Sequence, residues 1–165
     1  MKTLLILRHA KSSWKDNNLA DHDRPLKARG KRDAPRMGSL IKNENLIPNF
    51  ILSSTAKRTQ DTIELVAEAC SYDGKIKFRR DLYNAWTSDL IDILRGLKSK
   101  HKCVMIVGHN PGLEELLYVL TGEEEWLPTS ALAQIKLPIN RWNNLDDETE
   151  GKLINLWRPR ELGWS

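Results

Sequence analysis

The feature that most constrains this 165-residue sequence is Cys103–Val107, an uninterrupted apolar run between polar segments. Such a short continuous run is typical of a strand buried on both faces, as in the parallel sheets of α/β proteins. We therefore expect a sheet covered by helices on both sides. The length fits a single domain over residues 1–165, and 40% hydrophobic residues can fill its core without disulfides or a structural metal.

Apolar runs and apolar periodicity predict the remaining elements. Pro35 is expected to kink or delay the first helix, and Asn110 to cap the last one with Pro111 at its first position. The alternation of strands and helices predicts a three-layer α/β/α sandwich, mainly parallel with an antiparallel strand at its end, and a loose tail over 158–165. We expect strands at Thr3–Leu7, Phe50–Leu52, Ile76–Phe78, Ala131–Leu137 and Lys152–Trp157, and helices at Lys27–Asn43, Ala56–Cys70, Asp89–Leu97 and Leu113–Leu120.

Composition excludes several classes of protein. The two cysteines, Cys70 and Cys103, lie in apolar patterns, and the four scattered histidines form no zinc-binding spacing, so we expect no disulfide, metal or cofactor. The first apolar stretch ends at Arg8, too early for a secretory signal, and no segment reaches the roughly 20 apolar residues of a membrane helix. A net charge of +4 without a basic stripe argues against nucleic-acid binding. We expect a soluble, cytoplasmic protein.

Polar residues that suit chemistry follow three of the predicted strands. These are Arg8-His9, Ser53–Thr55 with Arg58 one turn later, and Gly108-His109-Asn110. Each alone has an ordinary structural explanation, such as a helix cap or a surface charge. The carboxyl ends of parallel strands meet at one sheet edge, however, so the three segments are expected to converge there.

Arginines and helix N-termini at such an edge indicate a phosphoryl ligand. His9 is the candidate nucleophile, because a neutral imidazole nitrogen accepts a phosphoryl group and later releases it to water. His109 is expected to stay protonated and to bind the phosphoryl oxygens together with Arg8 and Arg58.

Three ordered motifs then resemble those of the histidine phosphatase superfamily, also called phosphoglycerate mutase-like. They are Leu7–Lys11, where Ala10 replaces the usual glycine, then Ser53–Arg58, and Gly108–Gly112. The segment Arg24-Pro25-Leu26 is similar to one in the SixA-type phosphohistidine phosphatases, where the arginine joins the phosphate pocket. The resemblance implies a phosphoglycerate mutase-like fold and a phosphate pocket formed by Arg8, His9, Arg24, Arg58 and His109.

Two departures from the wider superfamily bear on the substrate. Leu82-Tyr83-Asn84 stands where larger members place an acidic glutamate, and Asn84 cannot protonate an alkoxide. An imidazole leaving from phosphohistidine needs less help, although a nearby aspartate remains an alternative acid (Asp81, Asp89 or Asp92). Between Asn84 and His109 there is also room for little beyond one helix and one strand, whereas larger relatives carry helical insertions that roof the pocket. An open site suits phosphohistidine on a protein surface, with Trp14, Asn84 and Trp86 as possible rim or substrate contacts.

The function expected from the sequence is therefore a metal-independent phosphatase acting on phosphohistidine in proteins. The phosphorylated partner would be a histidine phosphotransfer domain or a phosphocarrier. Three alternatives stay open: a small-molecule phosphomonoesterase on the same scaffold, a non-catalytic phosphoryl-binding module, and a mutase. The absent acid and the absent lid weaken the mutase, because return transfer requires water to be excluded.

Overall fold

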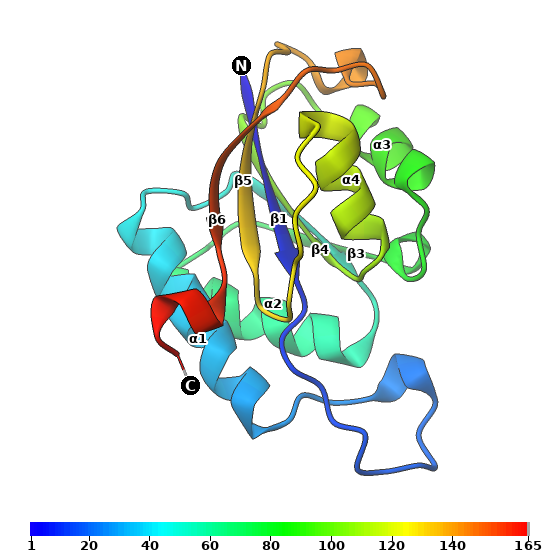
Figure 1. The fold of residues 1–165 in the computed structure, drawn as a ribbon, viewed down its shortest axis with the longest axis vertical. Helices are drawn as coiled ribbons and strands as arrows, with labels where there is room; N and C mark the ends of the chain where they lie inside the picture. Colours follow the sequence, from blue (N-terminus) through cyan, green and yellow to red (C-terminus); the bar gives the residue numbers. More distant parts are fainter. Residues whose placement is uncertain (165) are drawn as a thin grey trace.

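The computed structural model describes residues 1–164, which form one mixed sheet between two layers of helices (Figure 1). The strands are β1 (Lys2–Arg8), β2 (Phe50–Ser54), β3 (Ile76–Arg79), β4 (Cys103–Gly108), β5 (Leu132–Leu137) and β6 (Lys152–Trp157). The helices are α1 (Ala28–Asn43), α2 (Lys57–Cys70), α3 (Thr87–Arg95) and α4 (Gly112–Thr121). Short 3-10 turns are η1 (Asp21–Asp23), η2 (Arg80–Leu82), η3 (Trp142–Asn144) and η4 (Pro159–Leu162).

The strand order is β3-β2-β4-β1-β5-β6, and the first four of these strands run parallel. β5 and β6 continue the sheet in antiparallel fashion. The predicted α/β sandwich, mainly parallel with an antiparallel end, is confirmed. The register pairs Arg8 with Gly108 and Ser53 with Val107, so the carboxyl ends of β1, β2 and β4 lie side by side.

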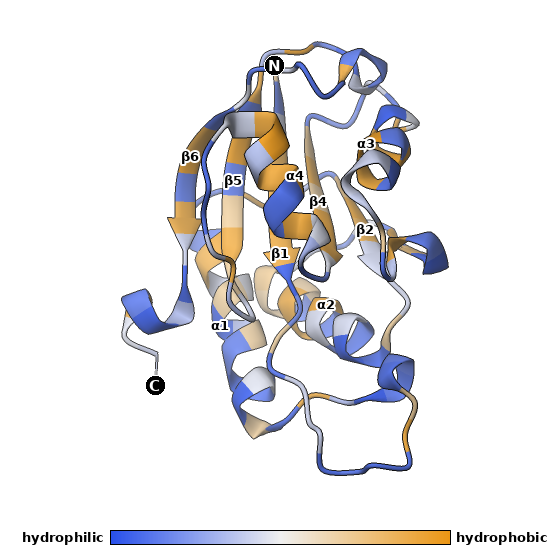
Figure 2. Cartoon of the chain, turned by 45° about the vertical axis from the view of Figure 1, so that its right-hand side comes forward, coloured by the Kyte–Doolittle hydropathy of each residue, from blue (hydrophilic) through white to orange (hydrophobic). Residues whose placement is uncertain are grey.

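Alternate residues of each strand feed two separate cores, because successive side chains point to opposite faces of a sheet. On β1, Leu4 and Ile6 pack in the core beneath α3 and α4, while Leu5 and Leu7 pack beneath α1 and α2. All four side chains are fully buried. Figure 2 shows the apolar colouring along β1 and β4, between the two helical layers.

Each helix begins one or two residues from its predicted position, and the N-termini of α4 and α3 show why. α4 begins at Gly112 with Pro111 as its N-cap, so the prediction of Asn110 as cap is wrong. The Asn110 side chain instead donates to Glu114 and to the carbonyl of Leu127. α3 begins two residues early, because the Asp89 carboxylate accepts the Trp86 N–H and thereby caps the first turn. α1 runs through Pro35 from Ala28 to Asn43.

The C-terminal segment also differs from the loose tail expected over 158–165. Pro159 is buried, and Leu162 and Trp164 pack against the core on the α1 side. Arg158 pairs with Glu125 and Glu161, which ties this segment to the loop before β5. Residue 165 lies outside the described residues. None of the helices formed by residues 1–164 has the length and apolarity that crossing a membrane requires.

Candidate active site

Three segments distant in sequence meet at the carboxyl edge of the sheet. The His9 N–H donates to the carbonyl of Gly108 at 3.2 Å, which holds the end of β1 against the end of β4. The rings of His9 and His109 lie 5.2 Å apart between centroids, and Arg58 reaches His109 from the first turn of α2. We call Arg8, His9, Arg58 and His109 the histidine–arginine cluster. The structure thus brings together these four residues of the sequence-based prediction.

The hydrogen bonding of His9 fixes which ring nitrogen is free. Its side chain is buried, and Nδ1 lies 2.8 Å from the carbonyl oxygen of Ala10. A carbonyl can only accept, so Nδ1 carries the proton and Nε2 of the neutral ring keeps a free lone pair. Burial lowers the pKa of His9 to about 3, and the neighbouring positive charges of Arg58 and Arg8 act in the same direction.

His109 is also neutral in this arrangement. Its Nδ1 lies 3.4 Å from Nη2 of Arg58, which can only donate, and its Nε2 lies 2.8 Å from the hydroxyl of Ser54. Burial, followed by the charge of Arg58, lowers the pKa of His109 to about 3. This differs from the protonated His109 expected from the sequence, because desolvation and a neighbouring guanidinium both disfavour imidazolium.

Both arginines of the cluster present buried N–H groups without protein acceptors. Arg8 donates through Nη1 to the carbonyl of Leu127 at 3.1 Å, and Arg58 donates to Asp21. The Nε atoms of Arg8 and Arg58 are fully buried and have no hydrogen-bond partner within residues 1–164. Buried donors of this kind carry a desolvation penalty that an anionic oxygen would remove.

Asp21, which sequence reasoning missed, connects Arg24 and Arg58, two of the three arginines assigned to phosphate. Its carboxylate accepts from Arg24 at 2.9 Å, from Arg58 at 3.1 Å and from the hydroxyl of Tyr83. The Tyr83 hydrogen bond, followed by Arg24 and Arg58, lowers the pKa of Asp21 to about 2. The one sequence feature that could have indicated this contact is the position of the Asp21 carboxylate, three residues before Arg24. The buried Arg24 side chain also donates hydrogen bonds to the hydroxyl of Ser12 and to the carbonyl of Ser13.

The three residues predicted to line the rim of the site, Trp14, Asn84 and Trp86, lie in different environments. Trp14 is 70% exposed, and the guanidinium of Arg24 lies 3.3 Å from its ring centroid. Trp86 is 71% exposed and precedes α3. Asn84 has a left-handed backbone (φ 61°) and lines a surface hollow with Asp81, Asp89 and Asp92, outside the histidine–arginine cluster.

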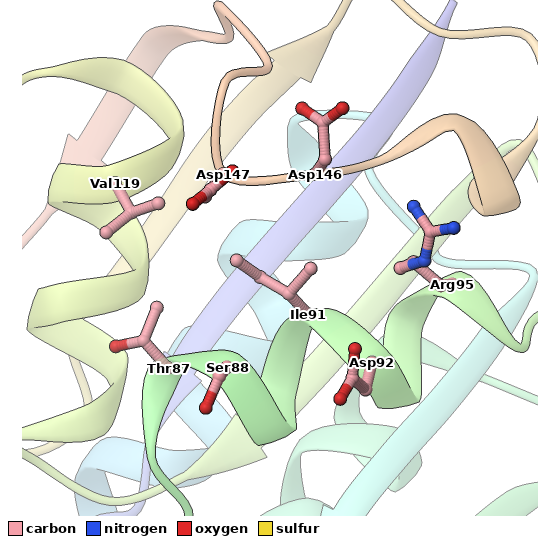
Figure 3. Close-up of a pocket in the computed structure, with 8 residues that line it drawn as sticks. All are labelled: Thr87, Ser88, Ile91, Asp92, Arg95, Val119, Asp146 and Asp147. Atoms are coloured by element: carbon pink, nitrogen blue, oxygen red, sulfur yellow. The ribbon is translucent and has the colours of Figure 1, made fainter.

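Two of the three aspartates proposed as alternative acids are engaged elsewhere, and the third borders surface hollows that contain no residue of the cluster. Asp81 pairs with Arg79 at 2.6 Å, and Asp89 caps α3. Asp92 borders a larger hollow between α3, α4 and the loop at Asp146 and Asp147, where Figure 3 shows the carboxylates. That hollow shares no lining residue with the cluster. Within the described part of the chain, no group of three or more His, Cys, Asp or Glu side chains is arranged to hold a metal ion.

The chain resembles known proteins both in sequence and in fold. A family model of the histidine phosphatase superfamily (branch 1) matches residues 4–86. An uncharacterized chloroplast protein of Arabidopsis thaliana is 33% identical over 150 residues, covering 86% of this chain and 69% of that protein.

Solved structures extend the likeness over almost the whole chain. The SixA protein of Agrobacterium tumefaciens, which carries a provisional assignment as a phosphohistidine phosphatase, superposes with a TM-score of 0.83 at 28% identity. The superposition covers 96% of this chain and 98% of that one. A protein histidine phosphatase SixA bound to tungstate shares the fold, with a TM-score of 0.83, 21% identity, and coverage of 97% and 99%. The chain therefore belongs to the histidine phosphatase superfamily, within its SixA-type branch, and is a phosphatase.

Proposed function

We propose that this phosphatase removes phosphoryl groups from histidine residues of proteins, through a phosphohistidine intermediate on His9 and without a metal ion. The observation that carries the proposal is the state of His9. Its Nδ1–H is bound to the carbonyl of Ala10, which leaves Nε2 as an unprotonated nucleophile beside the unpaired Nε donors of Arg8 and Arg58.

In the first step, the Nε2 lone pair of His9 forms a bond to phosphorus as the bond from phosphorus to the substrate imidazole breaks. The electron pair of the broken bond stays on the departing nitrogen. When the other nitrogen of that ring carries a proton, the substrate histidine leaves as a neutral imidazole and needs no acid. Arg8 and Arg58 compensate the charge on the phosphoryl oxygens, which is the main demand of phosphoryl transfer.

In the second step, water attacks the phosphorus on His9 and the bond from phosphorus to Nε2 breaks. The phosphoryl group leaves as dihydrogen phosphate, which then loses a proton to solvent, and His9 returns to its neutral form. The Nδ1–H bond to Ala10 is kept throughout, so the ring holds its orientation in both steps. His109 contributes its Nε2–H, now directed at Ser54, as a neutral donor near the phosphoryl oxygens.

The choice of phosphohistidine over an ester rests on the lack of an acid for the leaving group. Asn84 is exposed, and Asp81 is engaged by Arg79. Asp21 lies at the cluster, but its pKa of about 2 keeps it ionised at neutral pH. An alkoxide leaves slowly without a proton, whereas an imidazole does not require one.

The direct test is phosphate release from a phosphohistidine-bearing protein domain in EDTA. An alkyl phosphate ester is measured in parallel. His9→Ala removes the nucleophile, and His101→Ala serves as the matched control, because His101 stacks on Phe50 at the other end of the sheet. We expect fast release from phosphohistidine by wild type and His101→Ala, and loss of turnover by roughly 10³-fold or more in His9→Ala.

Each other result has a defined meaning. Faster cleavage of the ester would support a small-molecule phosphomonoesterase and reject the argument from the leaving group. Dependence on added metal would reject the metal-independent mechanism. Binding of phosphate without turnover of either substrate would support a phosphoryl-binding module instead.

A further inference from the structure

A basic groove opens beside the histidine–arginine cluster and shares one side chain with it. The groove measures about 440 Å³ and is bounded by the loop before β5 and by η4. Arg8 lines the groove and also belongs to the cluster, so the two sites are contiguous through one guanidinium. The groove is lined by Trp126 and by six charged side chains, five of them cationic and one a carboxylate: Arg8, Lys11, Arg29, Arg158, Arg160 and Glu161.

The cations of this groove are not all neutralised by their neighbours. Arg158 is paired with Glu125 and Glu161, and Arg29 lies 3.5 Å from Asp33. Within residues 1–164, neither Lys11 nor Arg160 has an ion pair. Arg160 is exposed, and Lys11 follows the nucleophile by two positions. The groove therefore offers two cations without an ion pair among residues 1–164, and it shares Arg8 with the histidine–arginine cluster.

An exposed tryptophan borders the same groove. Trp126 is 61% exposed, and its carbonyl accepts from Nε of Arg158 at 3.0 Å. The following residue, Leu127, is fully buried and holds Arg8 through its carbonyl. Figure 1 shows this loop descending from α4 to the end of β1, where the Ser130 N–H donates to the carbonyl of His9 at 3.0 Å. Exposed tryptophans beside arginines are characteristic of protein-binding surfaces.

We infer that this groove binds an acidic segment of the phosphorylated protein, next to the phosphohistidine that enters the histidine–arginine cluster. Lys11 and Arg160 attract the carboxylates, and Trp126 packs against their aliphatic stems or against the backbone. The inference rests on the proposed function and deepens it, because it specifies which phosphoproteins are preferred: those with Asp or Glu beside the modified histidine.

The test compares two phosphohistidine peptides that differ only in their flanks, Asp/Glu in one and Asn/Gln in the other. Phosphoramidate, which has no flank, reports the chemistry alone. The groove variant is Arg160→Glu, with Lys11→Gln as a second. The matched control is Lys98→Glu, the same charge reversal in another basic groove, lined by Lys75, Lys77 and Lys100 at the far end of the sheet.

We expect wild type and Lys98→Glu to show a kcat/KM about five- to twenty-fold higher for the acidic peptide, as two surface charge contacts would give. This ratio should approach one in Arg160→Glu, fall in Lys11→Gln, and decrease with added salt. Equal rates on both peptides in wild type, or an unchanged ratio in both groove variants, would overturn the inference. Failure to hydrolyse even phosphoramidate would instead count against the proposed function.

Discussion

Asp21 accepts two hydrogen bonds from Arg58, one at its backbone carbonyl at 2.7 Å and one at its carboxylate at 3.1 Å. The same carboxylate accepts from Arg24 at 2.9 Å. It therefore occupies donors of two of the three arginines that are assigned to phosphate, and its negative charge opposes an entering phosphoryl group. The backbone contact would remain if this charge were removed.

The first prediction is that Asp21→Asn binds inorganic phosphate more tightly. The amide keeps an acceptor for the arginines but removes a charge that repels the ligand, so Ki for phosphate should fall by about three- to ten-fold. Inhibition of turnover by phosphate measures Ki. Asp81→Asn is the control, since Asp81 pairs with Arg79 away from the cluster. A higher Ki in Asp21→Asn would show that Asp21 mainly positions the arginines.

A second prediction concerns Glu114, which organises the loop that holds Arg8. One carboxylate oxygen of Glu114 accepts from the Leu127 N–H at 2.7 Å and from the Asn110 side chain at 3.1 Å. Its charge also acts on Arg8, where it raises the pKa against the effect of burial. Glu114→Gln should lower kcat/KM by about three- to ten-fold and destabilise the fold by about 1–2 kcal/mol.

The adjacent residue provides the control for this prediction. Glu115 is exposed, and among residues 1–164 its side chain accepts only from the Thr87 hydroxyl at 3.2 Å. Glu115→Gln makes the same chemical change one position away, so kinetics and urea unfolding should both stay near wild type. Equal effects of the two variants would mean that helix charge, rather than the loop contact, is responsible.

Much of the framework is readable from the sequence because its strands are short apolar runs. Cys103–Val107 predicted β4, and the polar residues after β1, β2 and β4 predicted which side chains meet. This inference needs only parallel pairing and correct strand ends. The alternation of strands and helices predicts the pairing, and the apolar runs predict where the strands end. Helix starts were less predictable. The Asn110 side chain could either cap α4 or make tertiary contacts, and in the structure it donates to Glu114 and to the carbonyl of Leu127.

Residues on loops escaped prediction because no periodicity marks them. Asp21 and Tyr83 lie 62 positions apart, yet their side chains are hydrogen-bonded. Trp126 stands in a segment with several glutamates that reads as a polar connection, and only the structure shows it beside Arg8. Trp142 lies in another polar loop, but it is fully buried and donates to the carbonyl of His101. Such contacts depend on the assembled fold.

A third prediction tests how the nucleophile loop is held. The buried Thr62 hydroxyl accepts from the Ala10 N–H at 2.9 Å and donates to the carbonyl of Arg58 at 2.6 Å. Ala10 in turn orients His9 through its carbonyl. Thr62→Val leaves a buried N–H without an acceptor, so we expect a loss of about 1–3 kcal/mol in the free energy of unfolding.

The same variant should lower kcat/KM by roughly ten- to a hundred-fold at temperatures where it stays folded, because the His9 ring loses its fixed position. Thr62→Ser keeps the hydroxyl and should recover most of this loss, although it removes a buried methyl group. Urea unfolding and steady-state kinetics measure the two effects separately. If Thr62→Ser is as slow as Thr62→Val, packing of the methyl group rather than the hydrogen bonds controls the loop.

The last prediction is a pH dependence of stability caused by the two cluster histidines. The pKa of His9 and that of His109 are each about 3 in the folded chain, against about 6.5 for a histidine in an unfolded one. As the pH falls below 6.5 the unfolded chain binds protons first, so the stabilisation is complete above this pH and is lost towards pH 3. Between pH 7 and 5 the free energy of unfolding should fall by about 2 kcal/mol or more.

Urea unfolding at several pH values measures this slope, and variants assign it. His9→Asn and His109→Asn each remove one imidazole of the cluster, so each should reduce the slope between pH 7 and 5. His101→Asn is the control, because His101 stacks on Phe50 and lies outside the histidine–arginine cluster. Asp21 titrates near pH 2 and does not contribute in this window. A slope that is the same in all three variants and in wild type would show that His9 and His109 bind protons over the same pH range in the folded and the unfolded chain, contrary to their low pKa in the fold.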